Sequence, residues 1–404
     1  MLQRFLKPLA SLRLTITCLL LAFVLVLVGT LAQVHHGLYE VQSRYFRSWL
    51  VFWTSKTSGT PIPIFPGGWL IGAVLVLNLI ASLFTRFKFT PQKTGLWIAH
   101  LGLIFLLVGQ FVTEAFQVES QMRIEIGETR NYSEDFRKNE LVILDSAATS
   151  NAPILSVAET ALSHKEIKTA GSPFTLRVKS YLPNSYPAAR VTANSPQTLS
   201  STNGIGTLLC FTEAPVKFTM DETSHPAALI EIFKDNQSMG EWLVSTWLSK
   251  AYEASRIREW LGEEHSEVIA HPQCFTNNGH SYEIALRPKR IYKPYSLKLL
   301  EFHHDLHEGS SIDKNFSSRV RLFNPATKEN RDILIHMNNP LRYQGDTYYQ
   351  SSFEPGDQVT ILQVVRNPAS LTPYIACTMI TLGLIIQFLM HLTTFMKNRM
   401  GGKS

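Results

Sequence analysis

The sequence is poor in charge for a protein of 404 residues. Only 17% of its residues are charged, whereas about a quarter are charged in typical soluble proteins. Hydrophobic residues make up 45%, which excludes intrinsic disorder, because disordered chains are poor in apolar residues and rich in charge. The sequence therefore predicts a folded chain with both membrane-spanning and water-exposed parts.

The chain also lacks the motifs of several enzyme classes. It has no Walker A loop, no G-x-G-x-x-G that opens a helix, no H-E-x-x-H and no G-x-S-x-G. These absences disfavour a hydrolase, a nucleotide-driven pump or a dehydrogenase. Its four cysteines include no C-x-x-C, so thiol–disulfide exchange is not predicted as its own chemistry. The residues alone assign no catalytic group.

Four apolar runs are long enough to cross a bilayer, which takes about 20 residues of helix. They are residues 12–32, 69–84, 96–115 and 371–395. The first run is longer than the roughly 7 to 15 apolar residues of a signal peptide, so we expect it to be retained as a helix. The runs define an N-terminal membrane region (1–115), a large domain (116–370) and a fourth helix with a tail (371–404).

Three short segments beside these runs carry Lys and Arg but no Asp or Glu. They hold Arg4, Lys7, Arg13, Arg86, Lys88, Lys93, Lys397, Arg399 and Lys403. Because basic segments stay on the cytoplasmic side, we expect both termini in the cytoplasm and residues 116–370 outside the bacterial cytoplasmic membrane. The net charge of +6 then reflects topology, so these residues are expected to meet the lipid bilayer and no nucleic acid.

Residues 116–370 predict a mainly β, sandwich-like domain. Short β-branched and aromatic runs alternate there with turn signals. The clearest runs are 175–182, 228–233, 318–323 and 358–365. Near-helical spacing of apolar residues within 242–262 predicts one inserted helix. Cys210 and Cys274 both lie in this outer domain, where a disulfide is allowed, and the sequence leaves open whether they pair.

The loop between the first two runs is rich in aromatic side chains. Trp49, Phe52, Trp53, Phe65 and Trp69 lie in it or at its end. Amphipathic rings are favoured at the membrane–water interface, which predicts an interfacial segment. The alternative is that these rings line a site for a flat apolar ligand such as heme.

Two histidines lie inside apolar runs, where an ionisable side chain is costly and marks a candidate functional site. His100 and His391 are each a few residues from the cytoplasmic end of their run. We expect them at comparable depth, where both could ligate one heme iron. The alternative is that each forms a hydrogen bond across helices. Gly95, Gly102 and Gly109 recur every seven residues and predict a seam for a neighbouring helix, with His100 on another face.

A run of histidines at Phe302–His307 offers side chains suited to zinc or copper. Adjacent residues of an extended segment point to opposite faces, however, and a closed site would need further ligands. A polar loop is therefore the alternative.

Several short motifs stand at both ends of the chain. Near the N-terminus these are S-L-R-L-T at 11–15, A-H-L-G at 99–102 and G-E at 127–128. The more specific motifs lie at 314–318, 337–345, 348–352 and 364–368. Together they resemble the ResB (CcsB) family of system II cytochrome c biogenesis. Residues 131–295 resemble that family only loosely.

The resemblance implies a subunit that works with a CcsA/ResC-type membrane protein. Such a complex exports heme b and attaches it to the C-x-x-C-H motif of apocytochrome c, so the chain would be one subunit of a holocytochrome c synthase complex and no enzyme alone. The resemblance also implies that His100 is an axial ligand of the heme iron. The opposite ligand is expected from the partner, which leaves His391 a candidate only. The alternative function is a membrane-tethered extracytoplasmic binding or sensing protein in which His100 is structural.

The family motif before the fourth run is a candidate docking surface for the partner or the apocytochrome. Asn338-Asn339-Pro340 predicts a tight turn that delivers neighbouring tyrosines to the segment preceding this run. The alternative is a packed β-hairpin. The candidate docking residues are Asn338, Asn339, Pro340, Leu341, Tyr343, Gly345, Tyr349, Gln350, Arg366, Asn367 and Pro368.

Overall fold

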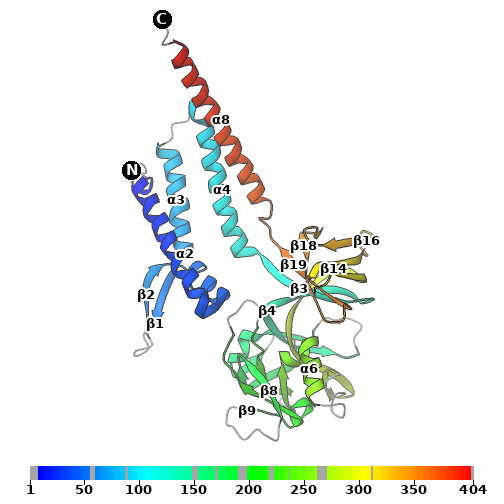
Figure 1. The fold of residues 1–404 in the computed structure, drawn as a ribbon. Helices are drawn as coiled ribbons and strands as arrows, with labels where there is room; N and C mark the ends of the chain where they lie inside the picture. Colours follow the sequence, from blue (N-terminus) through cyan, green and yellow to red (C-terminus); the bar gives the residue numbers. More distant parts are fainter. Residues whose placement is uncertain are drawn as a thin grey trace. The chain divides into compact units, whose positions relative to one another are not determined.

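The computed structural model forms two compact units, which are described separately (Figure 1). It describes residues 8–54, 60–86, 90–147, 153–168, 172–189, 198–217, 223–235, 237–261, 271–310 and 313–401. The helical unit comprises the described residues up to Val118 and from Arg366 onward, and the β unit comprises those between. Four basic residues that predict the sidedness lie outside the described residues: Arg4, Lys7, Lys88 and Lys403.

Each predicted apolar run is a long helix. The helices are α2 (Leu12–Val41), α3 (Gly68–Arg86), α4 (Thr94–Phe116) and α8 (Thr372–Gly401). All four are long and apolar enough to cross a membrane, so the prediction of a multi-pass membrane protein is confirmed. α2 continues well beyond the predicted end at residue 32. Its backbone departs from helical geometry at Gly37, where φ is 74°.

The glycine seam of α4 receives α8, and the two helices run side by side in Figure 1. Gly95, Gly102 and Gly109 are buried. A Cβ atom at Gly95 would lie 2.5 Å from the carbonyl oxygen of Gly383, and one at Gly109 would lie 2.0 Å from Cγ2 of Thr372. The backbones thus approach too closely for a larger residue, as in other small-residue helix interfaces. The predicted seam is confirmed, and α8 is its partner.

A buried amide holds α2 against α3. Asn78 of α3 is fully buried. Its Nδ2 donates to the backbone oxygens of Leu9 at 2.6 Å and Ser11 at 3.1 Å, and Thr15 Oγ1 donates to its Oδ1 at 2.7 Å. The whole amide is therefore satisfied, which is required at membrane depth, where no water competes for these bonds.

The chain between α2 and α3 folds back as a short helix and a hairpin. These elements are η1 (Gln42–Phe46), β1 (Leu50–Thr54) and β2 (Pro61–Pro66), and a single turn, η2 (Pro91–Lys93), precedes α4. Trp49 packs edge-on against Trp69 of α3, with ring centroids 6.1 Å apart. Arg47 Nε lies 2.6 Å from Glu114 Oε2 of α4. These contacts tie the returning segment to the neighbouring helices.

The β unit consists of antiparallel sheets, which confirms the predicted mainly β domain. Among the described residues, the largest sheet has ten strands. Its order is β16 (Glu329–His336), β15 (Asp313–Asn324), β14 (His280–Leu306), β4 (Thr129–Asp145), β3 (Val118–Glu125), β19 (Val359–Arg366), β18 (Asp346–Phe353) and β17 (Leu341–Tyr343), with β13 (Gln273–Asn277) on β14 and β5 (Leu155–Ala158) on β4.

Two smaller sheets and several short helices complete the described part of the β unit. The four-stranded sheet has the order β12 (Gln237–Ser245), β11 (Ala227–Lys234), β7 (Phe174–Leu182) and β6 (Glu166–Lys168). The three-stranded sheet has the order β8 (Ser185–Ala189), β10 (Leu209–Glu213) and β9 (Thr198–Leu199). The helices are η3 (Glu159–Ser163), η5 (Gly204–Thr207), α5 (Thr246–Ser249) and α6 (Ala251–Leu261).

Strand β14 is long enough to take part in two hydrophobic cores. Its first part contributes Ile284 and Leu286 to a core shared with the four-stranded sheet. Its second part contributes Leu297 to a core that includes Tyr348 of β18. The pairing of β14 with β4 shifts register twice, between Pro288 and Arg290 and between Tyr292 and Leu297. Both shifts lie between the parts of β14 that enter the two cores.

The predicted elements of the outer domain match the observed ones closely. The four predicted runs coincide, within one residue, with parts of β7, β11, β15 and β19. The predicted helix within 242–262 is confirmed over a shorter range, because β12 ends only at Ser245 and α5 and α6 follow. Cys210 is buried on β10, Cys274 is exposed on β13, and both thiols are free. The disulfide that the sequence allowed is therefore absent.

Candidate functional site

His100 lies on α4, six residues after its first residue, which is about 9 Å along the helix axis. The imidazole is half-buried, and its Nδ1 lies 2.8 Å from the backbone oxygen of Leu96. Because a carbonyl oxygen only accepts, Nδ1 carries the proton. In the neutral form of imidazole this leaves the lone pair on Nε2, and the hydrogen bond orients the ring, as it does in metal-binding histidines.

Aromatic contacts between α3 and α4 show which part of α3 lies beside His100. Phe84 of α3 meets Trp97 of α4 with ring centroids 6.4 Å apart, and Trp69 meets Phe111 at 5.9 Å. The two helices therefore run antiparallel, and His100 lies opposite about position 80 of α3. An imidazole held in this tautomer on an apolar helix offers the nitrogen lone pair that an axial ligand of a heme iron requires.

His391 of α8 lies at a different depth. Gln387 packs on Gly95 near the start of α4, and its amide Nε2 donates to Nε2 of His391 at 3.0 Å. In the same register, His100 faces about position 380 of α8, so His391 lies about 16 Å further along the axis. Two imidazoles on one metal hold their nitrogens about 4 Å apart, since each bond is about 2 Å long. The expectation that both histidines lie at one depth is wrong.

Asn338-Asn339-Pro340 forms the tight turn that the sequence predicts. The backbone N–H of Asn339 donates to the oxygen of His336 at 3.0 Å. Asn338 has a φ of 61°, a left-handed conformation in which asparagine is enriched. The motif asparagines therefore have a conformational role in this turn.

A second turn joins β17 and β18. Gln344 and Gly345 have φ values of 46° and 83°, and they lie between the paired residues Tyr343 and Asp346. A two-residue hairpin loop with two positive φ values is a type I′ turn, which favours glycine at its second position. The backbone conformation of this turn thus explains why the motif has a glycine at position 345.

Behind this hairpin lies a buried ionic network that sequence reasoning missed. Lys293 Nζ is 2.9 Å from Asp346 Oδ2, and the two side chains are 5% and 0% exposed. Tyr295 OH donates to the same oxygen at 2.9 Å and lies 2.7 Å from Tyr348 OH. Burial raises the pKa of Tyr295, so its phenol stays protonated and donates. The one signal in the sequence was that Asp346 directly follows the motif glycine.

The candidate docking surface is packed into the β unit only in part, because Asn338, Asn339 and Gly345 are exposed. Leu341 and Tyr348 are buried in the second core. Tyr343 and Gln350 are partly buried and form hydrogen bonds to neighbouring side chains. Tyr349, by contrast, is 40% exposed. Packing and hydrogen bonds therefore account for Leu341, Tyr343 and Gln350, and Tyr349 is the accessible tyrosine of the motif.

The Arg366-Asn367-Pro368 motif leads into α8 within the helical unit. Asn367 Oδ1 accepts a hydrogen bond from the backbone N–H of Ala369 at 2.8 Å and from Thr113 Oγ1 at 3.3 Å. Thr113 lies near the end of α4. Asn367 thus joins the end of one seam helix to the start of the other.

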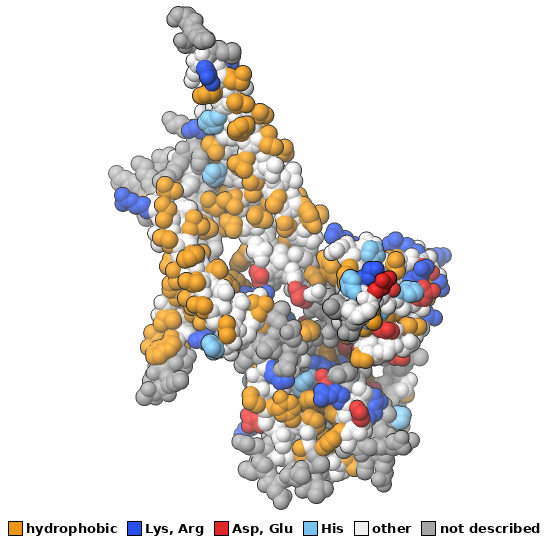
Figure 2. All heavy atoms as spheres, viewed as in Figure 1, with side chains coloured by type: hydrophobic (Ala, Val, Ile, Leu, Met, Phe, Trp, Pro, Cys, Tyr) orange, Lys and Arg blue, Asp and Glu red, His pale blue; other side chains and the backbone are white. Residues whose placement is uncertain are grey.

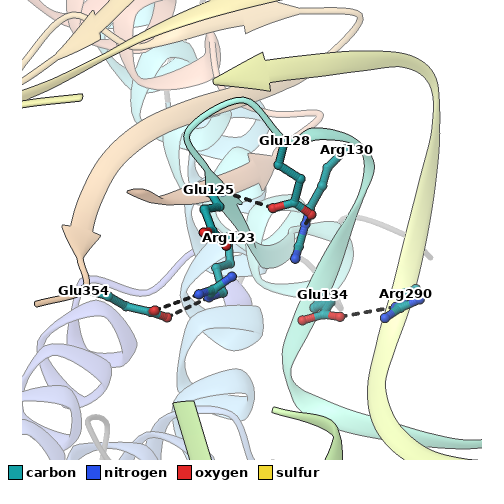
Figure 3. A network of polar contacts seen from close by, with 7 residues as sticks. All are labelled: Arg123, Glu125, Glu128, Arg130, Glu134, Arg290 and Glu354. Atoms are coloured by element: carbon teal, nitrogen blue, oxygen red, sulfur yellow. Dashed lines mark hydrogen bonds and ion pairs between the residues drawn. The ribbon is translucent and has the colours of Figure 1, made fainter. Parts of the chain in front are cut away.

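The Gly127-Glu128 motif forms the turn between β3 and β4 (Figure 3). Gly127 has a φ of 86°. The Glu128 carboxylate accepts from a backbone N–H three residues earlier at 3.0 Å and from Arg130 Nε at 2.5 Å. On the neighbouring strand, Arg123 donates two hydrogen bonds to Glu354, at 2.7 and 2.8 Å. Figure 3 shows these pairs fixing the first strands of the β unit.

The histidine run lies at the end of β14. His304 Nε2 is 2.7 Å from Asp313 Oδ1, and its Nδ1 is 3.2 Å from Asp357 Oδ1. The hydrogen bond to Asp313 is the main cause that raises the pKa of His304. His303 instead contacts Glu301 at 3.3 Å. Both rings are thus engaged in ion-pair contacts with carboxylates.

Comparison with known proteins matches three of the four more specific motifs to a family. A model described as the ResB-like family matches residues 243–361, which include the two turns and the buried network. Protein NrfI of Wolinella succinogenes is 31% identical over 103 residues, which are 26% of this chain and 11% of NrfI. The chain thus aligns with about a tenth of that relative. From these matches, residues 243–361 are similar to the ResB-like family, which is the resemblance that the motifs predict.

Proposed function

We propose that this chain is the heme-handling subunit of a cytochrome c biogenesis complex. The match of residues 243–361 to the ResB-like family supports a role in heme handling. The partner would be a CcsA/ResC-type membrane protein. Together the two would carry heme b across the bacterial cytoplasmic membrane and support its covalent attachment to apocytochrome c.

The single observation that carries the proposal is the state of His100. Its Nδ1–H is committed to the Leu96 carbonyl, 2.8 Å away, so its lone pair lies on Nε2. A histidine at membrane depth is costly and by default functional, and neutral imidazole is a standard axial ligand of heme. The second ligand would come from the partner, because His391 lies about 16 Å away along the axis.

The charge pattern supports a direction of transport. Basic segments without acidic residues stay cytoplasmic, which would place His100 near the cytoplasmic end of α4, where heme enters. Both termini would then lie in the cytoplasm, and the β unit outside, where apocytochromes are matured. On that side the exposed Tyr349 is available to the partner or the apocytochrome.

The test is cytochrome c maturation in cells that depend on this chain and its partner, followed by heme staining of separated proteins. His100→Ala is expected to abolish covalently bound heme, because the axial ligand is lost. His391→Ala serves as the matched control and should retain it. Both variants must reach wild-type levels in the membrane. Normal maturation with His100→Ala would contradict the proposal and favour a membrane-tethered sensing protein.

A further inference from the structure

The β unit has a cavity of its own, beside the first part of β14. Its volume is about 340 Å³, which lies at the small end of the range for ligand pockets. Its walls come chiefly from β14, from α5 and from the residues that begin β13. Two of the lining residues, His271 and Pro272, are exposed, so the cavity opens to the surface.

The β unit presents a charged surface to polar ligands. Figure 2 shows Lys, Arg, Asp and Glu side chains gathered on it, whereas hydrophobic side chains cover the visible face of the long helices. Charged side chains are favourable where water reaches them. A cavity that opens on this unit is therefore accessible to small polar solutes.

One lining residue is a carboxylate without a partner. Glu283 of β14 lines the cavity, and among the described residues it forms neither a hydrogen bond nor an ion pair. The side chain is half-buried, and this burial raises the pKa of Glu283. A carboxylate that is partly removed from water normally has a donor or a cation beside it. Glu283 therefore marks a place for a positively charged group.

The other charged residues that line the cavity are two arginines, and each has a counter-ion. Arg287 Nε lies 3.1 Å from Glu140 Oε1. Arg290 Nε lies 3.2 Å from Glu134 Oε1, a pair that Figure 3 shows. Arg287 is only 4% exposed, and its buried Nη2 has no hydrogen-bond partner in the part of the chain that the structure describes. An unsatisfied donor on a buried charged group is costly, and a carboxylate is the acceptor that best matches a guanidinium.

The spacing of Glu283 and Arg287 sets the length of a ligand that meets both. They are four residues apart on β14, whose pairing with β4 is regular from Tyr282 to Pro288, so their Cα atoms are about 13 Å apart. Both side chains reach into one cavity wall, which shortens the gap between the charged groups. A single α-amino acid is too short, because its two charged groups share one carbon atom. Two or three residues of extended peptide cover about 7 to 10 Å.

We propose that this cavity binds a short peptide with free ends, its ammonium group paired with Glu283 and its carboxylate with Arg287. The peptide has two or three small residues, because the cavity has room for little more. Leu248 of α5 lines the cavity and offers an apolar contact to its side chains. Ser249 Oγ donates to the backbone oxygen of Leu286 at 2.7 Å, which fixes α5 against β14 as a preformed wall. The proposal concerns the β unit alone and does not rest on heme handling.

Isothermal titration calorimetry of the purified full chain in detergent tests both ends of the ligand. The probes are trialanine, N-acetyl-trialanine, which lacks the ammonium group, and trialanine amide, which lacks the carboxylate. We expect trialanine to bind, and each blocked form to bind at least about tenfold more weakly, because each loses one charge-assisted hydrogen bond. Absence of trialanine binding at millimolar concentration, or equal affinity of the three peptides, would overturn the proposal.

A substitution in the cavity tests the residue that takes the ammonium group. Glu283→Gln keeps the size of the side chain and removes no contact among the described residues, so the variant should fold as the wild type does. We expect it to bind trialanine at least about tenfold more weakly and to bind N-acetyl-trialanine as the wild type does. Glu213→Gln is the matched control, because Glu213 is an exposed carboxylate on β10 that does not line the cavity. Equal affinity of the two variants for trialanine would exclude Glu283 as the binding carboxylate and refute the assignment.

Discussion

The buried pair of Lys293 and Asp346 allows one prediction with a worked magnitude. Asp346→Asn keeps the shape of the side chain but leaves the Lys293 ammonium buried without a counter-ion. The contact is 2.9 Å long and both side chains are nearly inaccessible to water. Removing one partner of such a pair costs about 3 to 5 kcal/mol. Since about 1.4 kcal/mol is a factor of ten, local opening of the hairpin should become roughly a hundred to a few thousand times more frequent.

Hydrogen exchange measured by mass spectrometry on the full chain resolves this effect to single strands. The amides of β17 and β18 should lose about two to three orders of magnitude in protection. Asp332→Asn is the matched control, because its ion pair with Arg321 is exposed, at 40% and 47% for the two side chains, and such pairs are worth about 0 to 1 kcal/mol.

A double variant tests the physical cause. Replacing both Lys293 and Asp346 by Met and Leu removes the unpaired charge, so it should be less destabilising than Asp346→Asn alone. The reasoning is refuted if Asp346→Asn changes protection no more than Asp332→Asn does, or if the double variant is the worst of the set.

Two further predictions concern stability. Burial lowers the pKa of His225 to about 3, below its unfolded value of about 6.5. The contribution of His225 to the free energy of unfolding is therefore fully present above pH 6.5. It falls as the pH drops toward 3, by up to about 1.4 kcal/mol per pH unit. His225→Gln should flatten that dependence in urea unfolding at pH 7, 5.5 and 4.5, and an unchanged slope would exclude His225 as its source. Gly95→Ala should lower the melting temperature in detergent, because its Cβ would lie 2.5 Å from the backbone oxygen of Gly383. Gly72→Ala is the control and should leave the melting temperature unchanged, because the space around Gly72 is open. Equal effects of the two substitutions would contradict the close packing of α4 on α8.

The sequence predicts the helical unit well, because both of its signals are local. Apolar length marks each span, and a period of seven marks the face of α4 that packs on α8. The depth of His391, by contrast, is not determined by the residues next to it in the sequence. The distance of His391 from the charged end of its own run predicts a depth like that of His100, but α8 continues to Gly401, well past the start of α4. Only the register between the two helices places His391 away from His100.

The β unit shows the same division between local and distant information. The turns at Asn338 and Gly345 can be predicted from the sequence, because few residue types adopt positive φ values. The partnership of Lys293 with Asp346 joins residues more than fifty positions apart, and an isolated Lys on a strand reads as a solvated charge.

The visible absorption spectrum of the purified chain, co-expressed with its partner, tests the central claim most directly. The wild type is expected to carry heme with a Soret band, and His100→Ala is expected to lose or shift that band, because the iron loses the Nε2 ligand. His391→Ala should match the wild type. A Soret band that is unchanged in position and intensity in His100→Ala would contradict the assignment of His100 as the heme ligand.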